Sequence, residues 1–378
     1  MTRPAYWHIA MIMTGVSLFG SAHAQTIVKL GFAGPLTGQI ANLGKDNERG
    51  AQLAIEDINA QHLVIGGKQV VLQLDSQDDA ADPRTATQVA QRLVDDGVVA
   101  VIGHMTSGTS ISASKIYSDA NVAQITPSAT NPAYTQQGFA TTFRLVSTDA
   151  VLGPALAKYA FESLHGKTVA VVDDATAYGQ GLADAFVVKA QSLGMKISSR
   201  DETNDKAIDF RAILTKIKGQ HPALIMYGGM EATAGPFAKQ ARQLAVSAHV
   251  LGGDGVCSDD LPKLAGDAAA DVICAQAGAP LDTLPQGAAF NARFQKRFGV
   301  PVLLYAPSNY DAVNVVVAAM KKADSTDRDK IAAAMRTVNV SGITGPIQFD
   351  AKGDLRSGAI SIYRYENGKK KLISVEKL

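Results

Sequence analysis

An excess of charge of either sign is the first thing that this sequence lacks. Its 378 residues include 36 Lys and Arg against 35 Asp and Glu, which gives a net charge of +1 at pH 7. Without a basic excess, nothing attracts the protein electrostatically to nucleic acid or to an anionic membrane surface. We therefore expect neither of them as a partner.

The motifs of metal, nucleotide and nucleophile sites are missing as well. The seven histidines form no H-E-x-x-H motif and no paired ligand spacing, so we expect no metal. No G-x-x-x-x-G-K-[ST] and no G-x-S-x-G occurs, and no Ser-His-Asp set can be placed. An enzyme is the weakest interpretation, and we expect a protein without a cofactor.

A hydrophobic run of membrane-spanning length is absent from the amino terminus. The run Ile9–Phe19 is too short to cross a bilayer. It follows Arg3 and precedes Ala22-His23-Ala24, an A-x-A cleavage site, so residues 1–24 are interpreted as a secretory signal peptide. The mature chain would begin at Gln25, and no cysteine stands there to carry a lipid anchor. We expect an exported, soluble protein.

Cysteine is scarce, with Cys257 and Cys274 as the only two. An oxidising compartment favours pairing them in a disulfide, although two free buried thiols are the alternative. The two residues lie 17 positions apart. In the chain-entropy account, a loop of this size stabilises the fold by about 3 kcal/mol.

Alternating strand and helix patterns fill the chain from Gln25 onward. Apolar runs such as Val98–Ile102 are typical of strands buried on both faces of a parallel sheet. Asp82-Pro83 predicts a helix start, and Asn367-Gly368 predicts a two-residue hairpin turn. The alternation restarts after residues 147–149, and each run is too short for a barrel. The sequence predicts an α/β fold of two doubly wound, Rossmann-like lobes with a ligand cleft between them.

The stretch Val98–Ser110 predicts an anion site. Gly103 turns the chain after the strand, and the small hydroxyl residues of 106–110 open a segment with helical spacing. Free backbone N–H groups, hydroxyl donors and the positive end of the helix dipole would converge there. Because the turn has no lysine, a small carboxylate suits it better than a phosphate. An ordinary strand-to-helix turn with a Ser or Thr cap is the alternative.

Polar residues of two kinds follow the predicted strands. Ser107 and Thr130 follow strands of the first half, and Asp254 follows a strand of the second half. Two sets of strand ends could face one cleft, with hydroxyls holding a ligand carboxylate and Asp254 holding its ammonium. This division suits a zwitterion. The side chains that could line an apolar pocket for the rest of the ligand are Leu43, Met105, Tyr178 and Met230.

Short motifs spread over the mature chain identify a family. The motifs are G-P-L-T-G at Gly34–Gly38, R-G-A-Q-L-A-I-E-D-I-N-A at Arg49–Ala60, D-D-A-A-D-P at Asp78–Pro83, V-I-G-H at Val101–His104, I-T-P-S-A-T-N-P at Ile125–Pro132, Y-G-Q-G at Tyr178–Gly181, Y-G-G at Tyr227–Gly229, L-G-G-D-G at Leu251–Gly255 and G-D-L at Gly353–Leu355. Each is weak alone, but in this order they are specific. The chain resembles the periplasmic leucine/isoleucine/valine-binding proteins of ABC transporters.

The resemblance implies a type I periplasmic-binding fold, in which two lobes joined by three crossings close on the ligand by a hinge motion. It places residues 25–147 and 278–352 in an N-terminal lobe, and residues 148–277 and 353–378 in a C-terminal lobe. It also implies a monomer in the periplasm. The protein would capture a small α-amino acid, such as leucine, isoleucine or valine, and deliver it to an inner-membrane ABC permease.

The resemblance also assigns site residues by position. Ser107 and Thr130 match the residues that hold the α-carboxylate of the ligand, and the residue at Ser128 contributes a backbone group. Asp254 matches the acidic partner of the ammonium, which is often a glutamate. Tyr178 matches the aromatic residue that crosses the cleft from the second lobe.

This sequence departs from the family pattern at three places. Leu43 stands where the family often has an aromatic residue, and Met230 stands where it often has a tyrosine. Both changes should enlarge or soften the pocket, so the preferred ligand side chain stays open, as does the contact of these two residues with it. The family's first-lobe cysteine pair is absent, because Ala81 and Thr106 stand there.

Some residues and functions keep alternative interpretations. Met105 could belong to the core rather than to the pocket. Glu231 is interpreted as a helix-start acid, and His104 as a structural histidine with its hydrogen bonds satisfied. A sensory or regulatory ligand-binding module for amides or aromatic acids is the alternative function. An aromatic carboxylate ligand would tolerate the loss of Asp254 but not that of Ser107.

Overall fold

Two mostly parallel sheets form the framework of the protein. The computed structural model describes residues 1–2, 25–356 and 358–377, so the predicted signal peptide, apart from its first two residues, lies outside the described residues. One sheet has six strands and the other has seven. The expected α/β class with two doubly wound units is confirmed. In the part of the chain that the structure describes, no helix combines the length and the hydrophobicity needed to cross a bilayer.

The first sheet comes from the first 144 residues of the chain. Its strands are β1 (Thr26–Gly34), β2 (Val64–Ile65), β3 (Lys68–Asp78), β4 (Ala100–Gly103), β5 (Ala123–Thr126) and β6 (Thr142–Arg144). They lie in the order β2-β3-β1-β4-β5-β6, parallel except for the short β2. Burial on both faces explains why β4 is a continuous apolar run, whereas β5, although fully buried, contains the polar residues Gln124 and Thr126.

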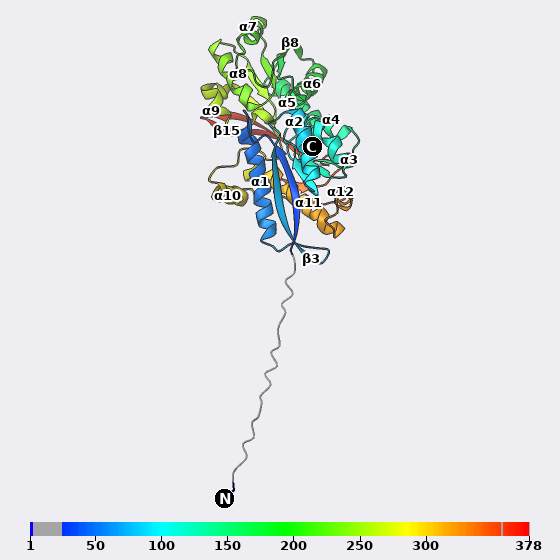
Figure 1. Cartoon of the computed structure of the whole chain (residues 1–378). Coiled ribbons are helices and arrows are strands. Elements are labelled where there is room, and N and C mark those ends of the chain that lie inside the picture. Colours follow the sequence, from blue (N-terminus) through cyan, green and yellow to red (C-terminus); the bar gives the residue numbers. More distant parts are fainter. Residues whose placement is uncertain (3–24, 357, 378) are drawn as a thin grey trace.

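Helices from both ends of the chain cover this sheet. They are α1 (Ala41–Asn59), α2 (Pro83–Asp95), α3 (Ser107–Asp119), α4 (Ala133–Gln136), α10 (Gly287–Phe298), α11 (Ala306–Ala323) and α12 (Arg328–Met335), with a small hairpin of β12 (Val340–Gly342) and β13 (Gly345–Ile347) beside them. Apolar side chains of α1, α11 and α12 pack on one face, and those of α2 and α3 pack on the other. Figure 1 shows the late helices α11 and α12, in orange, beside the blue and cyan elements.

The second sheet has the same doubly wound plan with an added hairpin. Its strands are β7 (Thr168–Asp173), β8 (Lys196–Glu202), β9 (Leu224–Gly228), β10 (His249–Gly252), β11 (Val272–Ala277), β14 (Ala359–Glu366) and β15 (Lys369–Lys377), in the order β15-β14-β11-β10-β9-β7-β8. Its helices are α5 (Asp149–Glu162), α6 (Ala177–Ser192), α7 (Arg211–Gln220), α8 (Glu231–Gln243) and α9 (Leu261–Ala265), with short 3-10 turns at Asp254–Val256 and Gly266–Asp271; a third 3-10 turn, Leu281–Thr283, follows this sheet and precedes α10. Apolar side chains of α5 and α6 pack on one face, and those of α7, α8 and α9 on the other.

Local sequence signals account for several element ends. The Asp82 carboxylate accepts a hydrogen bond from Thr85 N at 2.7 Å and caps α2, as predicted. Asn367 and Gly368 have φ values of 51° and 72°, which fits the predicted hairpin turn between β14 and β15. The strand predicted over Val98–Ile102 begins later, at Ala100, because Val98 N instead donates to Leu93 O at the end of α2.

The chain crosses three times between the two sheets. β6 leads to α5, β11 leads to the 3-10 turn before α10, and the segment after β13 leads to β14. The first and third crossings touch, because Arg144 N donates to Gly353 O at 2.9 Å. At Gly353, where φ is +95°, a Cβ atom would lie only 2.1 Å from Thr142 O, so only glycine fits.

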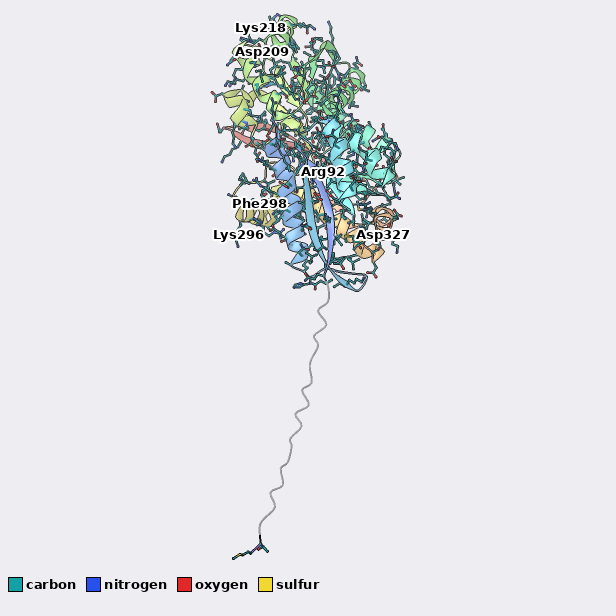
Figure 2. All side chains as sticks on the ribbon, viewed as in Figure 1. Arg92, Asp209, Lys218, Lys296, Phe298 and Asp327 are labelled. Atoms are coloured by element: carbon teal, nitrogen blue, oxygen red, sulfur yellow. A yellow bond between two sulfur atoms is a disulfide. The ribbon has the colours of Figure 1, made fainter. Side chains whose placement is uncertain are left out.

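Charged side chains lie on the outside of both units. Figure 2 shows Asp209 and Lys218 at the edge of the second unit and Arg92, Lys296 and Asp327 on the first, and all five are exposed. The full sequence has nearly equal numbers of basic and acidic residues, 36 and 35. The burial of apolar surface therefore holds each sheet to its helices.

The predicted disulfide is confirmed. Cys257 and Cys274 are bonded, with their Cα atoms 5.4 Å apart, and both are fully buried. The bridge ties the segment after the 3-10 turn Asp254–Val256 to the central part of the second sheet, at β11. It closes a loop that includes α9.

Replacing both cysteines, in Cys257→Ala/Cys274→Ala, should lower the free energy of unfolding by about 3 kcal/mol, because the unfolded chain regains the entropy of the closed loop. Urea denaturation of the oxidised protein and of the variant measures this difference. Adding a thiol reductant should lower the urea midpoint of the wild type, because it opens the disulfide, and should leave the midpoint of the variant unchanged. Equal midpoints for oxidised wild type and variant would contradict the prediction.

Candidate functional site

A cavity lies where the carboxyl ends of the strands of both sheets meet. Its volume is about 640 Å³. The loops after β4, β5, β7, β9 and β10 all contribute to its walls, as expected for doubly wound sheets. Six of the eight residues predicted for the site line it, namely Met105, Ser107, Ser128, Tyr178, Met230 and Asp254.

The amino terminus of α3 forms one wall of this cavity. Thr106, not Ser107, caps the helix, since the Thr106 hydroxyl accepts from Thr109 N at 3.4 Å. Ser107 Oγ instead accepts from Asn131 N at 3.2 Å, and Ser128 Oγ donates to Met105 O at 2.8 Å. These bonds join the loop after β5 to the amino terminus of α3, where the first N–H groups of a helix have no partner within the helix itself. The wall can therefore bind a small carboxylate.

Thr130 and Leu43 lie behind the cavity walls. Both side chains are fully buried, and neither lines the cavity. Leu43 packs with Met105 and Tyr305 in one apolar cluster. The Thr130 hydroxyl has no hydrogen-bond partner in the described part of the chain, and Thr130 O accepts from Asp149 N at 2.9 Å. Direct ligand contact of Thr130 and Leu43 stays a prediction.

Asp254 supplies a buried carboxylate on the opposite wall, with an exposed fraction of 1%. The Tyr178 hydroxyl donates to Oδ1 and the Tyr305 hydroxyl donates to Oδ2, each at 2.8 Å. Gly255 N donates to the Tyr178 hydroxyl at 3.0 Å, which completes the chain of donors. Burial raises the pKa of Asp254, and the two tyrosine hydrogen bonds oppose that rise.

Tyr305 is the site residue that sequence reasoning missed. Tyr305 directly precedes α11, a helix that packs on the first sheet. Its hydrogen bond to Asp254 therefore joins the two units. The Asp46 carboxylate of α1 fixes the Tyr305 backbone. It accepts four hydrogen bonds of 2.8 to 3.1 Å from the N–H groups of Leu303, Leu304, Tyr305 and Ala306. The Tyr-Ala-Pro sequence of 305–307 marks a helix start, but nothing in it indicates contact with a residue 51 positions away.

A fully buried arginine fixes the loop that follows β5. Arg144 donates to Ala129 O at 2.8 Å and to Asn131 O at 2.9 Å, so it spans Thr130 on both sides. Arg144 Nε also donates to Asp354 Oδ1 at 2.8 Å, which ties this loop to the third crossing. The site loop and the connection between the units are therefore parts of one hydrogen-bond network.

His104 is structural, as predicted. It is fully buried, with Nδ1 at 2.7 Å from Asp79 Oδ2 and Nε2 at 3.0 Å from the Tyr117 hydroxyl. Both ring nitrogens are engaged away from the cavity. Within residues 1–2, 25–356 and 358–377, no group of three or more His, Cys, Asp or Glu side chains could hold a metal ion.

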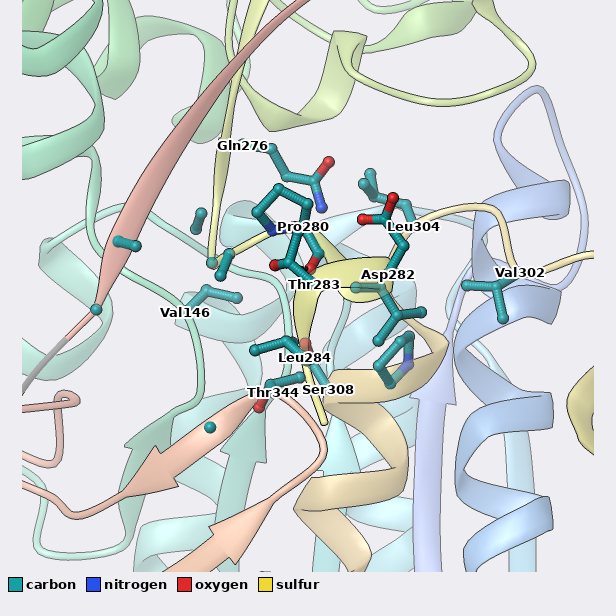
Figure 3. Close-up of a pocket in the computed structure, with 18 of the residues that line it drawn as sticks. Val146, Gln276, Pro280, Asp282, Thr283, Leu284, Val302, Leu304, Ser308 and Thr344 are labelled. Atoms are coloured by element: carbon teal, nitrogen blue, oxygen red, sulfur yellow. Dashed lines mark hydrogen bonds between the residues drawn. The ribbon is translucent and has the colours of Figure 1, made fainter. Parts of the chain in front are cut away.

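A second cavity, of about 560 Å³, lies beside the crossings. Figure 3 shows Val146, Gln276 and Pro280 among the side chains around it, together with Leu304. Leu304 and Tyr305 are neighbours in the chain, yet Leu304 lines this cavity and Tyr305 lines the other one. None of the predicted site residues lines the second cavity, so the first is the candidate site.

Comparison with known proteins gives a family match over nearly the whole chain. Residues 27–370 match the family described as Periplasmic binding protein. The chain is 33% identical over 356 residues to the "Leucine-, isoleucine-, valine-, threonine-, and alanine-binding protein" of Pseudomonas aeruginosa, and the match covers 94% of each chain.

Solved structures with the same fold carry different ligands. The branched-chain amino acid transporter substrate-binding protein LivJ of Streptococcus pneumoniae, solved with isoleucine, is 27% identical with a TM-score of 0.83, covering 93% of this chain and 99% of that one. An ABC-transporter solute-binding protein of Rhodopseudomonas palustris, solved with 3,4-dihydroxybenzoic acid, is 25% identical with a TM-score of 0.81, covering 93% and 97%.

A buried carboxyl beside Thr130 leads to a prediction about stability and pH. Asp149 is fully buried, neither of its oxygens has a partner among the described residues, and burial raises its pKa to about 8. The folded state therefore keeps this proton up to about pH 8, whereas the unfolded chain loses it near the ordinary value of 3.8. Stability should fall as pH rises between these values, by up to about 1.4 kcal/mol per pH unit.

Asp149→Asn should remove this part of the slope, because an amide does not ionise. Urea unfolding at a series of pH values from about 5 to 8 measures it. The exposed Asp95→Asn serves as the control and should keep the wild-type slope. An unchanged slope in Asp149→Asn would show that this carboxyl is ionised in the folded protein.

Proposed function

The chain belongs to the periplasmic binding protein family, and from that premise we propose that it captures a small α-amino acid and delivers it to an inner-membrane ABC permease. The ligand is an apolar amino acid such as leucine, isoleucine or valine. Binding proceeds by hinge closure of the two lobes. The protein acts as a monomer in the periplasm after cleavage behind Ala24.

One observation carries this proposal: a buried carboxylate and a helix amino terminus form parts of the same cavity. Asp254 can pair with an ammonium group, and the backbone around Ser107 can hold a carboxylate. A ligand with both charges would have each of them paired inside the protein, which burial demands. An α-amino acid meets this requirement.

Apolar side chains between the two charged regions suit an apolar ligand side chain. The cavity-lining residues of this kind include Ile40, Ala81, Met105, Ile111, Met230 and Ala232. Two of them are methionines, whose flexible side chains adapt to different shapes. The pocket would therefore accept several aliphatic amino acids, as the name of the Pseudomonas aeruginosa relative says of that protein.

The three crossings support a division into two lobes that can move. We place the boundaries at 147/148, 277/278 and 352/353. The first lobe holds the first sheet together with α10, α11 and α12, and the second lobe holds the other sheet with its hairpin. Because the chain matches a family described as Periplasmic binding protein, we propose that it binds and releases its ligand without a chemical reaction. Turnover of a bound amino acid would contradict this.

A second candidate ligand is an aromatic acid, taken up for transport or sensed by a regulatory module. The Rhodopseudomonas palustris protein solved with 3,4-dihydroxybenzoic acid favours it. Such a ligand has a carboxylate for the α3 terminus but no ammonium for Asp254. A thermal-shift screen with amino acids, small amides and aromatic acids separates the two candidates, because a binder raises the melting temperature.

Asp254→Ala should lower the affinity for leucine at least tenfold, about 1.4 kcal/mol, since the buried ammonium loses its carboxylate. Isothermal titration calorimetry measures the effect. Ser107→Ala should weaken binding of leucine and of an aromatic acid alike, because both ligands present a carboxylate. Leucine binding with unchanged affinity in Asp254→Ala would refute the zwitterion assignment.

Tyr305→Phe should weaken leucine binding about tenfold, in line with one hydrogen bond to a charged group of about 1.4 kcal/mol. The phenyl ring keeps its packing against Leu43 and Met105, so the change isolates the hydroxyl that holds Asp254. Tyr159→Phe, in helix α5 away from the cavity, is the matched control and should bind as the wild type does. Full affinity in Tyr305→Phe would mean that Tyr178 positions the carboxylate alone.

A further inference from the structure

The two lobes also contact each other across the cleft, near the rim of the cavity. Asn42, in the first turn of α1, has its Nδ2 atom 2.7 Å from Glu231 Oε1 and 3.1 Å from Asp260 Oδ2. Glu231 opens α8 and Asp260 precedes α9, and both helices cover the second sheet. One amide group of the first lobe therefore contacts two carboxylates of the second.

Glu231 is the expected helix-start acid of α8, but its side chain is also buried. Its exposed fraction is 1%, and Oε2 has no hydrogen-bond partner among the described residues. Within residues 25–356 and 358–377, Asn42 is the only side chain that donates to Oε1 of Glu231, and its amide group also contacts Asp260. A buried carboxylate with so few donors is more stable with a proton than without one.

The charged groups around Glu231 favour the same protonated form. Asp260 and Asp259, on the segment before α9, both raise its pKa, whereas Lys263 of α9 lowers it and is itself paired with Asp260. The charge of Glu231 in turn contributes to raising the pKa of two tyrosines, Tyr305 before α11 and Tyr365 on β14. Burial is the largest cause, Asn42 opposes it, and together these groups raise the pKa of Glu231 to about 7.

We propose that Asn42, Glu231 and Asp260 form a proton-dependent latch, which holds the lobes closed while Glu231 carries a proton and loosens when the proton leaves. The latch rests on the hinge closure of the proposed function. Residues 230 and 232, on both sides of Glu231, line the ligand cavity, so the latch closes at the rim of the binding site. Ligand affinity therefore depends on pH through a residue outside the cavity lining.

The direction of the effect follows from linkage. Opening the cleft separates Glu231 from Asn42 and returns the carboxyl to water, where its pKa approaches the ordinary value of 4.5. The closed form then binds the proton more tightly than the open form, and closure takes up a proton between pH 4.5 and about 7. As pH rises through about 7, this contribution to closure is lost, and the apparent affinity falls with the closed population.

Calorimetric titration of leucine at about pH 6 and about pH 8 tests the latch. The wild type should bind about tenfold more weakly at the higher pH, while Glu231→Gln, which cannot ionise, should change less than about twofold. Repeating the titration at about pH 6 in buffers of different ionisation enthalpy should reveal proton uptake in the wild type and none from this site in Glu231→Gln. Glu162→Gln, at an exposed acid of α5, is the matched control and should behave as the wild type.

Small-angle X-ray scattering without ligand tests the same latch independently of the proposed function. The radius of gyration of the wild type should increase between about pH 6 and about pH 8, and that of Glu231→Gln should stay constant. A wild-type pH dependence retained in Glu231→Gln, by either method, would overturn the latch. If no amino acid binds at either pH, the proposed function fails, and the scattering result still decides the latch.

Discussion

The carboxylate of Asp254 is buried between two lobes, and a buried charge must be paired. One lobe supplies Tyr178 and the other supplies Tyr305, so the two halves of the protein meet through one side chain. This interaction constrains the rest of the cleft. Tyr178 lies in the first turn of α6, whereas Asp254 and Tyr305 lie in segments outside regular strands and α-helices, so other contacts must fix those segments.

Buried polar side chains fix those loops. Asp46 accepts four backbone hydrogen bonds from the segment before α11, and Arg144 binds the carbonyl groups on either side of Thr130. His104 joins the loop after β4 to the loop after β3 through Asp79. The polar atoms of these buried side chains form hydrogen bonds with other groups of the protein. These hydrogen bonds hold the site loops rigid before a ligand binds.

Several buried carboxyl groups lie in or near the cleft. Burial raises the pKa of Asp149 to about 8, that of Glu231 to about 7 and that of Asp174 to about 6, and it also raises the pKa of Asp254. Asp254 and Asp174 both line the ligand cavity. A ligand with a cationic group would relieve the cost of ionising these carboxyls, whereas an aromatic acid would not. The acidity of the cleft therefore supports an amino acid ligand, and it is the basis of the proton dependence that we propose for closure.

The sequence by itself determined the α/β class and the two doubly wound units, it favoured the disulfide, and it located the segments after the strands that carry Ser107, Tyr178 and Asp254. The class, the units and these segments depend on local periodicity, on turn residues and on motif order, whereas the disulfide was expected from the cysteine count and an oxidising compartment. Only the tertiary structure decided that Tyr305 pairs with Asp254, that Leu43 and Thr130 lie behind the walls, and that Glu231 meets Asn42. The last contact joins residues 189 positions apart, and its partners are polar residues with no distinctive spacing. Such contacts arise from the packing of one lobe against the other, which local sequence patterns do not encode.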